Sequence, residues 1–460
     1  MSPAPDLAEL QGNILRGYGF EHVVHLLLHA ESGAAARGLL RDLAPDVTSA
    51  EEWPGRARPS RTLNLAVTYT GLERLGVPAR WLEALPRAFR EGPRRRAAAL
   101  GDVGPSAPAY WESGLGTGEV HLMASVGCRS LDGLDSEEDR LRQLVDRRGG
   151  LRVVAAPRGE ALRHQREHFG FADGFAQPDV AGAPARRRTA GGGVPLPGGG
   201  WRPLRLGEFV LGFPDEDGQT NEGPDPRLMR HGTFVVYRRL QQRVGEFRRM
   251  LGEASDLTGL PPELVAAKLV GRWRDGTPLE LAPDRVPTDL TDRQAPDLSN
   301  DFRYLPHDRV GEMCPRGAHV RRTNPRDSLD FGGVVASGGV LSARHRIIRR
   351  GMPYGSPLAP DAEEDDLDRG LLFVCFNADI ERQFETVQGD WCSDGDAMGL
   401  GEDCDPLAGT GPLRKLTVPV AGGAPAFIPV GRAVVVTRGA EYLLAPSRSA
   451  LHGLAHRSFA

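Results

Sequence analysis

Lysine is nearly absent from this sequence, because Lys268 and Lys415 are the only two among 57 basic residues. The remaining basic residues are arginines, so a single arginine indicates a function only where neighbouring residues point to the same chemistry. The 61 acidic residues leave a formal net charge of −4. That charge provides no electrostatic drive toward nucleic acid or an anionic membrane. We therefore expect neither as a partner.

Cysteine and long apolar runs are also scarce. The five cysteines are an odd number spread over a long chain, which is unlike a disulfide framework. No apolar run approaches the roughly 20 residues that a membrane-spanning helix needs. The first twenty residues lack a basic segment followed by an apolar core, and they lack a twin arginine. These absences predict a cytoplasmic protein with the composition of an ordinary globular chain.

Hydrophobic periodicity in the first third of the chain predicts a β-α-β-β-α-β order, with two helical inserts at 71–75 and 81–90. The expected strands are 22–29, 63–69, 119–126 and 151–155, and the expected helices are 34–43 and 136–147. This order is the split β-α-β plan of a ferredoxin-like module. We assign residues 1–165 to it.

A looser copy of the same order follows, and we assign residues 166–460 to a second module with long insertions. Its expected strands are 234–239, 345–349, 371–377 and 434–437, and its expected helices are 241–250 and 380–388. The sequence thus predicts an α+β fold of two modules with antiparallel sheets. Residues 389–405, rich in glycine and aspartate, are expected to form a solvent-side loop; they lack the spacing of an EF-hand.

Three short stretches combine residue types that carry chemistry. Gly170-Phe-Ala-Asp-Gly174 places a carboxylate between glycines, and Cys314-Pro-Arg-Gly-Ala-His-Val-Arg-Arg-Thr-Asn-Pro-Arg326 places a histidine beside a basic cluster. Arg349-Arg-Gly-Met-Pro-Tyr-Gly355 supplies a cation in a turn-rich context. Taken singly, such residues are as typical of an Asx turn, a packed polar histidine or a solvated arginine.

A competing motif is His164-Gln-Arg-Glu-His168, which matches the H-x-x-E-H pattern of some zinc peptidases. Two imidazoles four residues apart on one helix face would bind zinc, and the glutamate would act as a base. The glycine-rich stretch follows at once, leaving little room for that helix. A zinc hydrolase is therefore a remote alternative.

The three stretches together resemble the dye-decolourising peroxidase family, with its GxxDG signature, its histidine-centred run and its RxGxPYG-like turn. The resemblance extends over most of the chain and includes three further segments. They are Leu10-Gln-Gly-Asn-Ile-Leu-Arg-Gly17, Gly207-Glu-Phe-Val-Leu-Gly212 and Leu372-Phe-Val-Cys-Phe-Asn-Ala-Asp-Ile-Glu-Arg-Gln-Phe384. It implies a duplicated ferredoxin-like architecture and one haem b per chain, held mainly by the second module.

The resemblance assigns a role to the residue at the centre of each stretch. His319 is expected to be the axial ligand of the haem iron, with His345, His307 and His231 as weaker candidates. Asp173 is expected to relay a proton, and Arg349, rather than the adjacent Arg350, to stabilise charge. The flanking Gly170 and Gly174 would allow the backbone to approach a flat cofactor.

Two further residues are expected near the cofactor. Arg326 is a candidate to pair with a haem propionate, because arginine binds carboxylates through two hydrogen bonds. Asp379, which follows an expected strand, is either the acceptor that orients the axial histidine or only the cap of the next helix. The sequence leaves these two readings of Asp379 equally open.

The implied function is a peroxidase that reduces hydrogen peroxide through a ferryl intermediate and oxidises phenolic or dye-like aromatic donors. The ordinary aspartate pKa, near ~4, predicts activity weighted toward acidic pH. A haem-handling protein and a dedicated biosynthetic oxidase stay open as alternatives. The natural donor, any surface aromatic that relays electrons and any homo-oligomer are not readable from the sequence.

Overall fold

The computed structural model describes residues 4–51, 53, 58–174, 176–184, 190–196, 199–284, 300–330, 339–410, 415–419 and 422–459. Its strands are β1 (His22–Ala30), β2 (Arg61–Thr68), β3 (Leu122–Cys128), β4 (Leu151–Ala155), β5 (Arg158–Glu160), β6 (Val194–Pro195), β7 (Trp201–Arg202), β8 (Thr233–Gln242), β9 (Ile348–Arg349), β10 (Met352–Tyr354), β11 (Gly370–Asn377), β12 (Lys415–Val418), β13 (Ala426–Pro429) and β14 (Val435–Ala445).

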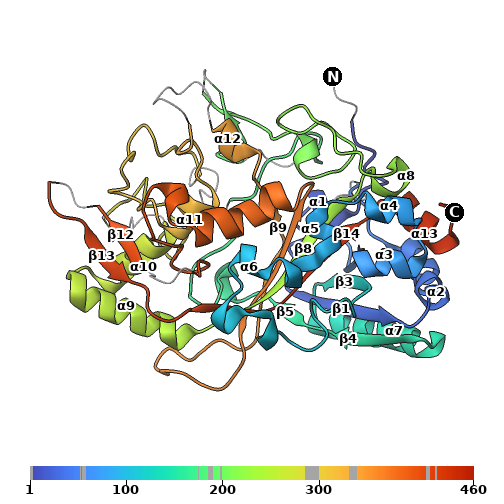
Figure 1. Cartoon of the computed structure of the whole chain (residues 1–460). Coiled ribbons are helices and arrows are strands. Elements are labelled where there is room, and N and C mark those ends of the chain that lie inside the picture. Colours follow the sequence, from blue (N-terminus) through green and yellow to red (C-terminus); the bar gives the residue numbers. More distant parts are fainter. Residues whose placement is uncertain are drawn as a thin grey trace.

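The helices are α1 (Gly12–Leu15), α2 (Gly33–Leu43), α3 (Tyr69–Leu75), α4 (Ala79–Glu83), α5 (Arg87–Arg95), α6 (Ala97–Leu100), α7 (Leu131–Arg148), α8 (Pro226–Met229), α9 (Val244–Thr258), α10 (Pro262–Val270), α11 (His319–Thr323), α12 (Val340–Ala343), η8 (Glu381–Ser393) and α13 (Arg448–His456), joined in places by short 3-10 turns. Figure 1 shows α2, α7 and α13 at one end of the molecule, and α9, α10 and the β12–β13 hairpin at the other.

The main sheet is antiparallel, with the strand order β10-β11-β8-β14-β2-β3-β1-β4. The second half contributes β10-β11-β8-β14 and the first half β2-β3-β1-β4. When the four strands of each half are numbered along the chain, both halves have the spatial order 2-3-1-4. This is the strand order of a ferredoxin-like module, so the predicted α+β fold of two related modules is confirmed. The two modules share one sheet because β14 pairs with β2 at Leu443–Thr68 and Leu444–Val67. The boundary at residues 165 and 166 stays a prediction.

The sheet is curled, so that its two ends come close together. Strand β5 pairs with β1 near one end, and β10 forms the other end. A Cβ added to Gly159 of β5 would lie 3.0 Å from Cβ of Met352 in β10. The curl turns one face of the sheet into a concave surface, and the candidate site lies on that side.

The two faces of the sheet carry different residues because side chains alternate along a strand. Leu26 and Leu65 face the core beneath α2, α7 and α13, and Leu27 and Ala66 belong to the core on the opposite, concave face. The predicted strands and helices of the first module are present, with shifts of a few residues at their ends.

Two elements of the second module differ from the predictions. The predicted helix 241–250 begins at Val244, because β8 continues to Gln242 and pairs with β11 and β14. The predicted strand 345–349 shortens to Ile348–Arg349, and two residues separate it from β10, which pairs with the same neighbouring strand, β11. Residues 344–347 leave the sheet because α12 ends only at Ala343.

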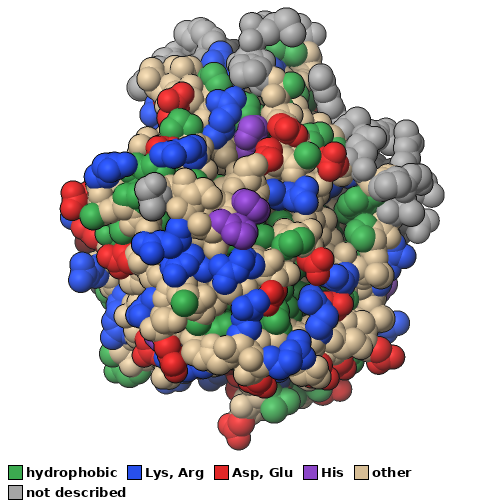
Figure 2. Space-filling model, turned by 90° about the vertical axis from the view of Figure 1, so that its right-hand side faces the viewer, with side chains coloured by type: hydrophobic (Ala, Val, Ile, Leu, Met, Phe, Trp, Pro, Cys, Tyr) green, Lys and Arg blue, Asp and Glu red, His purple; other side chains and the backbone are tan. Residues whose placement is uncertain are grey.

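The surface at the end of the molecule near α2 and α13 carries interspersed charges of both signs, with single scattered hydrophobic side chains (Figure 2). Local ion pairs such as Arg227–Asp225 balance charge there. Across the described ranges, no helix has the length and apolar character needed to cross a bilayer. The cytoplasmic location stays a prediction. All five cysteines lie among the described residues, where they are buried and form no disulfide.

Candidate functional site

The glycine-rich stretch forms a loop that a buried carboxylate holds in place. Glu167 accepts hydrogen bonds from the backbone N–H groups of Phe169 (2.9 Å) and Phe171 (2.8 Å), and from the Gln242 side chain. Gly170 and Gly174 both have φ of +92°, a conformation that residues with a Cβ rarely adopt. The loop therefore needs both predicted glycines to present its aspartate.

Asp173 projects from this loop toward Arg349 of β9. The distance between Asp173 Oδ1 and Arg349 Nη1 is 3.3 Å, and the same oxygen accepts the Gly174 N–H at 2.6 Å. The Gln177 side chain bonds both the N–H of Arg349 (3.1 Å) and its carbonyl (3.0 Å), so the strand is fixed opposite the loop. The structure thus brings the two predicted residues together and positions each from its backbone.

The choice between Arg349 and Arg350 follows from strand alternation. Arg349 points to Asp173, whereas the guanidinium of Arg350 donates to the carbonyls of Asn13 and Ile14 at the N-terminal segment. The guanidinium of Arg350 therefore binds the N-terminal segment and does not face Asp173. The cation beside the aspartate is the one that the sequence predicts.

The charge of Arg349 lowers the pKa of Asp173 below its ordinary value of 3.8, although burial acts in the opposite direction. The aspartate therefore stays ionised, and able to accept a proton, at more acidic pH than an isolated side chain. This extends the expected acidic range of activity further downward.

His319 opens helix α11 and is oriented by an aspartate that the sequence did not suggest. Its Nδ1–H donates to Oδ2 of Asp405 at 2.8 Å, and Asp405 is fully buried. The imidazole keeps 30% of its side-chain surface accessible. Nε2 has no hydrogen-bond partner within the described part of the chain. A histidine held through Nδ1 in this way offers an unprotonated Nε2 as a ligand.

Asp405 is in turn fixed by its own backbone. Its Oδ1 accepts the N–H groups of Leu407 and Ala408, each at 2.8 Å, and its N–H donates to the Cys392 carbonyl at 2.7 Å. The prediction that 389–405 is a solvent-side loop is wrong. Part of it belongs to η8, and Asp403 and Asp405 are fully buried because they bond backbone groups inside the protein. The only sequence signal at Asp405 is that a proline follows it, a dipeptide that favours a turn.

The electrostatic coupling between the two residues is strong. Burial alone lowers the pKa of His319, but the charge and hydrogen bond of Asp405 more than offset this, so the pKa is raised overall. Burial raises the pKa of Asp405, and His319 with the backbone donors brings it below its ordinary value. Asp405 is therefore an anion that supports positive charge at His319.

The prediction that Asp379 orients His319 is wrong, and its alternative reading is the correct one. Oδ1 of Asp379 accepts the backbone N–H of Arg382 at 3.0 Å, which is a cap at the start of η8. Asp405, 86 residues from His319 along the chain, occupies the orienting position.

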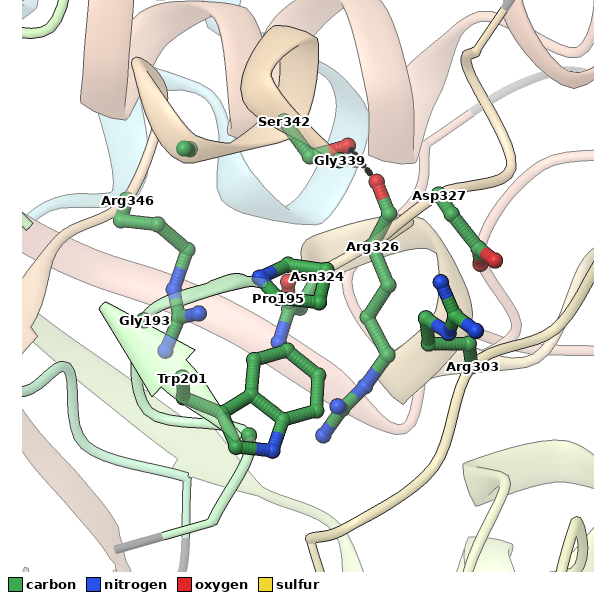
Figure 3. A pocket seen from close by; sticks show the side chains of 12 residues that line it. Gly193, Pro195, Trp201, Arg303, Asn324, Arg326, Asp327, Gly339, Ser342 and Arg346 are labelled. Carbon is green, nitrogen blue, oxygen red and sulfur yellow. Dashed lines mark hydrogen bonds between the residues drawn. The ribbon is translucent and has the colours of Figure 1, made fainter. Parts of the chain in front are cut away.

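Arg326 lines a small pocket rich in arginine (Figure 3). Arg326 and Arg346 flank Trp201 there, with Arg303 and Asn324 nearby. Nε of Arg326 is buried without a hydrogen-bond partner. Burial, reinforced by Arg326 and Arg349, lowers the pKa of Arg346 to about 9. Guanidinium groups gathered this closely favour an anionic group between them.

The two arginines directly after the candidate ligand serve the fold. Arg321 pairs with Asp308 at 2.9 Å, and both are buried. Arg322 is fully buried and donates to the carbonyls of Gly317, Trp391, Asp394 and Asp403. Arg322 thus ties the segment around α11 to the segment that carries Asp405.

Three features of the site fit a haem. His319 presents an oriented nitrogen, the Asp173–Arg349 pair provides an acid–base group beside a cation, and the guanidinium groups of the arginine pocket are suited to pairing with carboxylates. Asp173 and Arg349 keep 49% and 33% of their side-chain surface accessible. Their charges reach His319, because both alter its pKa. All three side chains therefore lie within electrostatic range of one another.

The zinc alternative does not match the geometry. The stretch from His164 to His168 is a 3-10 turn followed by extended chain, and His164 has φ of +60°. Nε2 of His168 bonds the carbonyl of Tyr354 at 2.8 Å, and Glu167 holds the glycine-rich loop. Within the described ranges, no group of three or more His, Cys, Asp or Glu side chains could hold a metal ion.

Comparisons with known proteins identify the family of the chain. Residues 267–400 match the model of the dye-decolourising peroxidase C-terminal region, described as "Dyp-type peroxidase, C-terminal". The chain is 31% identical to the multifunctional dye peroxidase DyP2 of Amycolatopsis sp., covering 97% of this chain and 96% of that protein. It is 30% identical to Peroxidase 2 of Mycetinis scorodonius, covering 97% and 87%.

A solved structure of a dye-decolorizing peroxidase in complex with 2,6-dimethoxyphenol superposes with a TM-score of 0.81 at 27% identity, covering 98% of this chain and all of that one. The likeness in sequence and fold thus extends over nearly the whole length. The chain belongs to the dye-decolourising peroxidase family, and it is a peroxidase of that type.

Proposed function

We propose that the protein binds one haem b through His319, reduces hydrogen peroxide with the help of Asp173 and Arg349, and oxidises small aromatic donors. The observation that carries this proposal is the presence of two charged or hydrogen-bonded pairs within electrostatic range of each other. An ionised Asp173 lies 3.3 Å from Arg349, and His319 is held by Asp405. Peroxide chemistry at a haem needs both pairs, since one holds the iron and the other moves a proton.

Haem iron, when bound, supplies the redox centre at which peroxide receives two electrons. Asp173 would take a proton from one oxygen of the peroxide and return it to the other, which leaves as water. Oδ1 of Asp173 already accepts from Gly174 and Arg349, so Oδ2 is the atom that moves the proton. Arg349 stabilises the charge that develops as the oxygen–oxygen bond breaks.

Aromatic donors complete the reaction. Two phenol molecules each give up one electron and one proton, so that one peroxide and two phenols yield two water molecules and two phenoxyl radicals. The likeness to a peroxidase solved with 2,6-dimethoxyphenol supports phenols as the donor class.

His319 and Asp405 determine how the cofactor is held. The anionic partner fixes the proton on Nδ1, directs Nε2 toward the iron and increases its basicity. Arg326 and Arg346 would hold the propionates, since Arg326 has a buried nitrogen without a partner. A haem carrier would need only these groups. The Asp173–Arg349 pair therefore favours a peroxidase over a haem-handling protein.

The proposal is tested by mixing haem-loaded protein with hydrogen peroxide in a stopped-flow spectrometer. Asp173→Asn should slow the bimolecular reaction by about 10²–10⁴-fold, because it removes general acid–base catalysis. Asp135→Asn, a change in a surface carboxylate that pairs with Arg158, is the matched control. An unchanged rate in Asp173→Asn, with haem content equal to the wild type, would refute the assigned role.

A further inference from the structure

A chamber of about 460 Å³ lies on the concave face of the sheet, with Asp173 and Arg349 in its wall. His319 is not among the residues that line it, so the chamber lies on the side of the Asp173–Arg349 pair. Its size falls within the range of small-molecule sites. The peroxide reaction itself needs far less space.

The floor of the chamber is formed by three neighbouring strands, β1, β3 and β2. Residues two apart on each strand line it, as expected for one face of a sheet. The middle row of this floor is polar. His25 of β1 lies opposite Ser125 of β3, and Ser125 lies opposite Asn64 of β2. A polar row in register crosses a face that is otherwise core.

The rows on either side of this one differ, because the row of Val23, Gly127 and Thr62 contains a further polar residue and the other row is apolar. On one side, Leu27, Met123 and Ala66 are paired in the same register and belong to the apolar core of this face. Polar groups in such a position lose their hydration, and they stabilise the fold only when hydrogen-bonded. Asn64 is satisfied in this way, because its Nδ2 donates to Gln11 Oε1 and to the Thr48 carbonyl and its Oδ1 accepts from Tyr18. Within the described part of the chain the side chains of His25 and Ser125 bond each other, which leaves this pair able to bond a ligand in the chamber.

The groups of the row are neutral and already oriented. His25 Nδ1 and Ser125 Oγ are 2.8 Å apart, and burial lowers the pKa of His25 to about 4, so the imidazole is uncharged near neutral pH. Tyr18 O–H donates to Asn64 Oδ1 at 3.2 Å. Ser125 keeps some accessible surface toward the chamber. The row thus offers both a donor and an acceptor without a charge.

The surroundings of the row suit an aromatic ring. Phe20 and Tyr18 line the chamber, and their ring centroids are 5.9 Å apart. Gly127 lets the Phe20 ring pack close to the β3 backbone, since a Cβ there would lie 2.8 Å from that ring. A flat ligand can therefore lie against the aromatic side chains while its hydroxyl reaches the polar row.

We propose that this chamber is the binding site for a small, neutral phenol, and that the His25–Ser125 pair of the row selects it through its hydroxyl group. The inference rests on the proposed peroxidase function, for which the phenol is the electron donor. A ligand held here lies in the same chamber as Asp173 and Arg349. Large dyes exceed its volume and are not its ligands.

The test measures equilibrium binding to the resting haem-loaded protein by isothermal titration calorimetry, without peroxide. The probes are guaiacol and 1,2-dimethoxybenzene, which differ in that a methyl group replaces the hydroxyl hydrogen. The wild type should bind guaiacol at least about tenfold more tightly, because the second probe leaves the polar row unpaired. Ser125→Ala should reduce this preference to about twofold or less.

Two further variants make the result specific. Ser125→Leu fills the chamber and should abolish binding of both probes. Ser136→Ala removes a hydroxyl that bonds only the α7 backbone, at Asp132, and should change nothing. Should Ser125→Leu fail to fold, Ser125→Ala alone decides.

Equal affinities for the two probes would overturn the inference. So would an unchanged preference in Ser125→Ala, or retained binding in a folded Ser125→Leu. A failure of this inference can be distinguished from a failure of the proposed peroxidase function. A wild type that reacts with peroxide but binds no phenol refutes only the chamber assignment. A wild type that binds phenol but ignores peroxide refutes the peroxidase mechanism and leaves the selective chamber in place.

Discussion

Replacing Asp405 with asparagine should weaken haem binding, although the two side chains have the same shape. Oδ1 of Asp405 accepts two backbone N–H groups, from Leu407 and Ala408, so the amide oxygen of asparagine has to stay at that position. The amide NH₂ then faces His319. A donor at this point forces Nδ1 to accept, and the ring proton moves to Nε2, where it blocks coordination of the iron.

The size of the effect follows from the two orientations that the asparagine amide can adopt. Turning the amide restores the contact with His319 but leaves two buried N–H groups facing a donor, at about 1 kcal/mol each. Keeping the amide in place requires the unfavourable tautomer. A loss of about 2 kcal/mol corresponds to roughly 30-fold in affinity, which lies within the 10–100-fold typical of such partners.

The assay is titration of the apoprotein with haem, monitored by absorption, for the wild type and Asp405→Asn. Asp403→Asn is the matched control, since Asp403 is equally buried but bonds the Thr417 N–H and does not contact His319. We expect it to change stability and to keep the wild-type affinity for haem. Wild-type affinity and unchanged axial ligation in Asp405→Asn would refute the assigned role of Asp405.

Three further outcomes are expected. Arg349→Leu should slow the peroxide reaction by about 10²–10³-fold. It should also move the acid limb of the pH profile to higher pH, because Asp173 loses the cation that lowers its pKa. An acid limb that does not move in stopped-flow measurements contradicts this. Arg322→Met should lower the free energy of unfolding by at least about 3 kcal/mol, since several buried carbonyls lose their donor; denaturant unfolding within 1 kcal/mol of the wild type would argue against it. His319→Ala should purify with little haem while His345→Ala keeps it, and equal haem content by pyridine haemochrome assay is the contrary result.

Much of the fold was predictable because it depends on local periodicity. The strands of the first module alternate clearly, and the β-α-β-β-α-β order fixes their spatial arrangement. Strand β9 was harder, since two residues carry no period and its place is set by pairing with Cys375 and Phe376. The join of the modules at Leu443 and Thr68 depends on long-range pairing that no local pattern records.

The site residues likewise divide into those that lie in local sequence motifs and those that only long-range contacts bring to the site. Asp173, His319 and Arg349 lie in distinctive local stretches, and the structure brings them together. Asp405 was missed because only the folded chain places it beside His319. Asp379 was a natural candidate, since a carboxylate after a strand can cap a helix or orient a ligand, and only distance separates the two roles. The row through Ser125 depends on strand register, which the sequence does not show.

The central claim is that this chain activates hydrogen peroxide at a haem held by His319. Rapid-scanning absorption spectra of the haem-loaded wild type, mixed with one equivalent of hydrogen peroxide, test it most directly. The account predicts that the haem spectrum changes within seconds and returns to its starting form when two equivalents of guaiacol are added. A haem spectrum that does not respond to peroxide would contradict it.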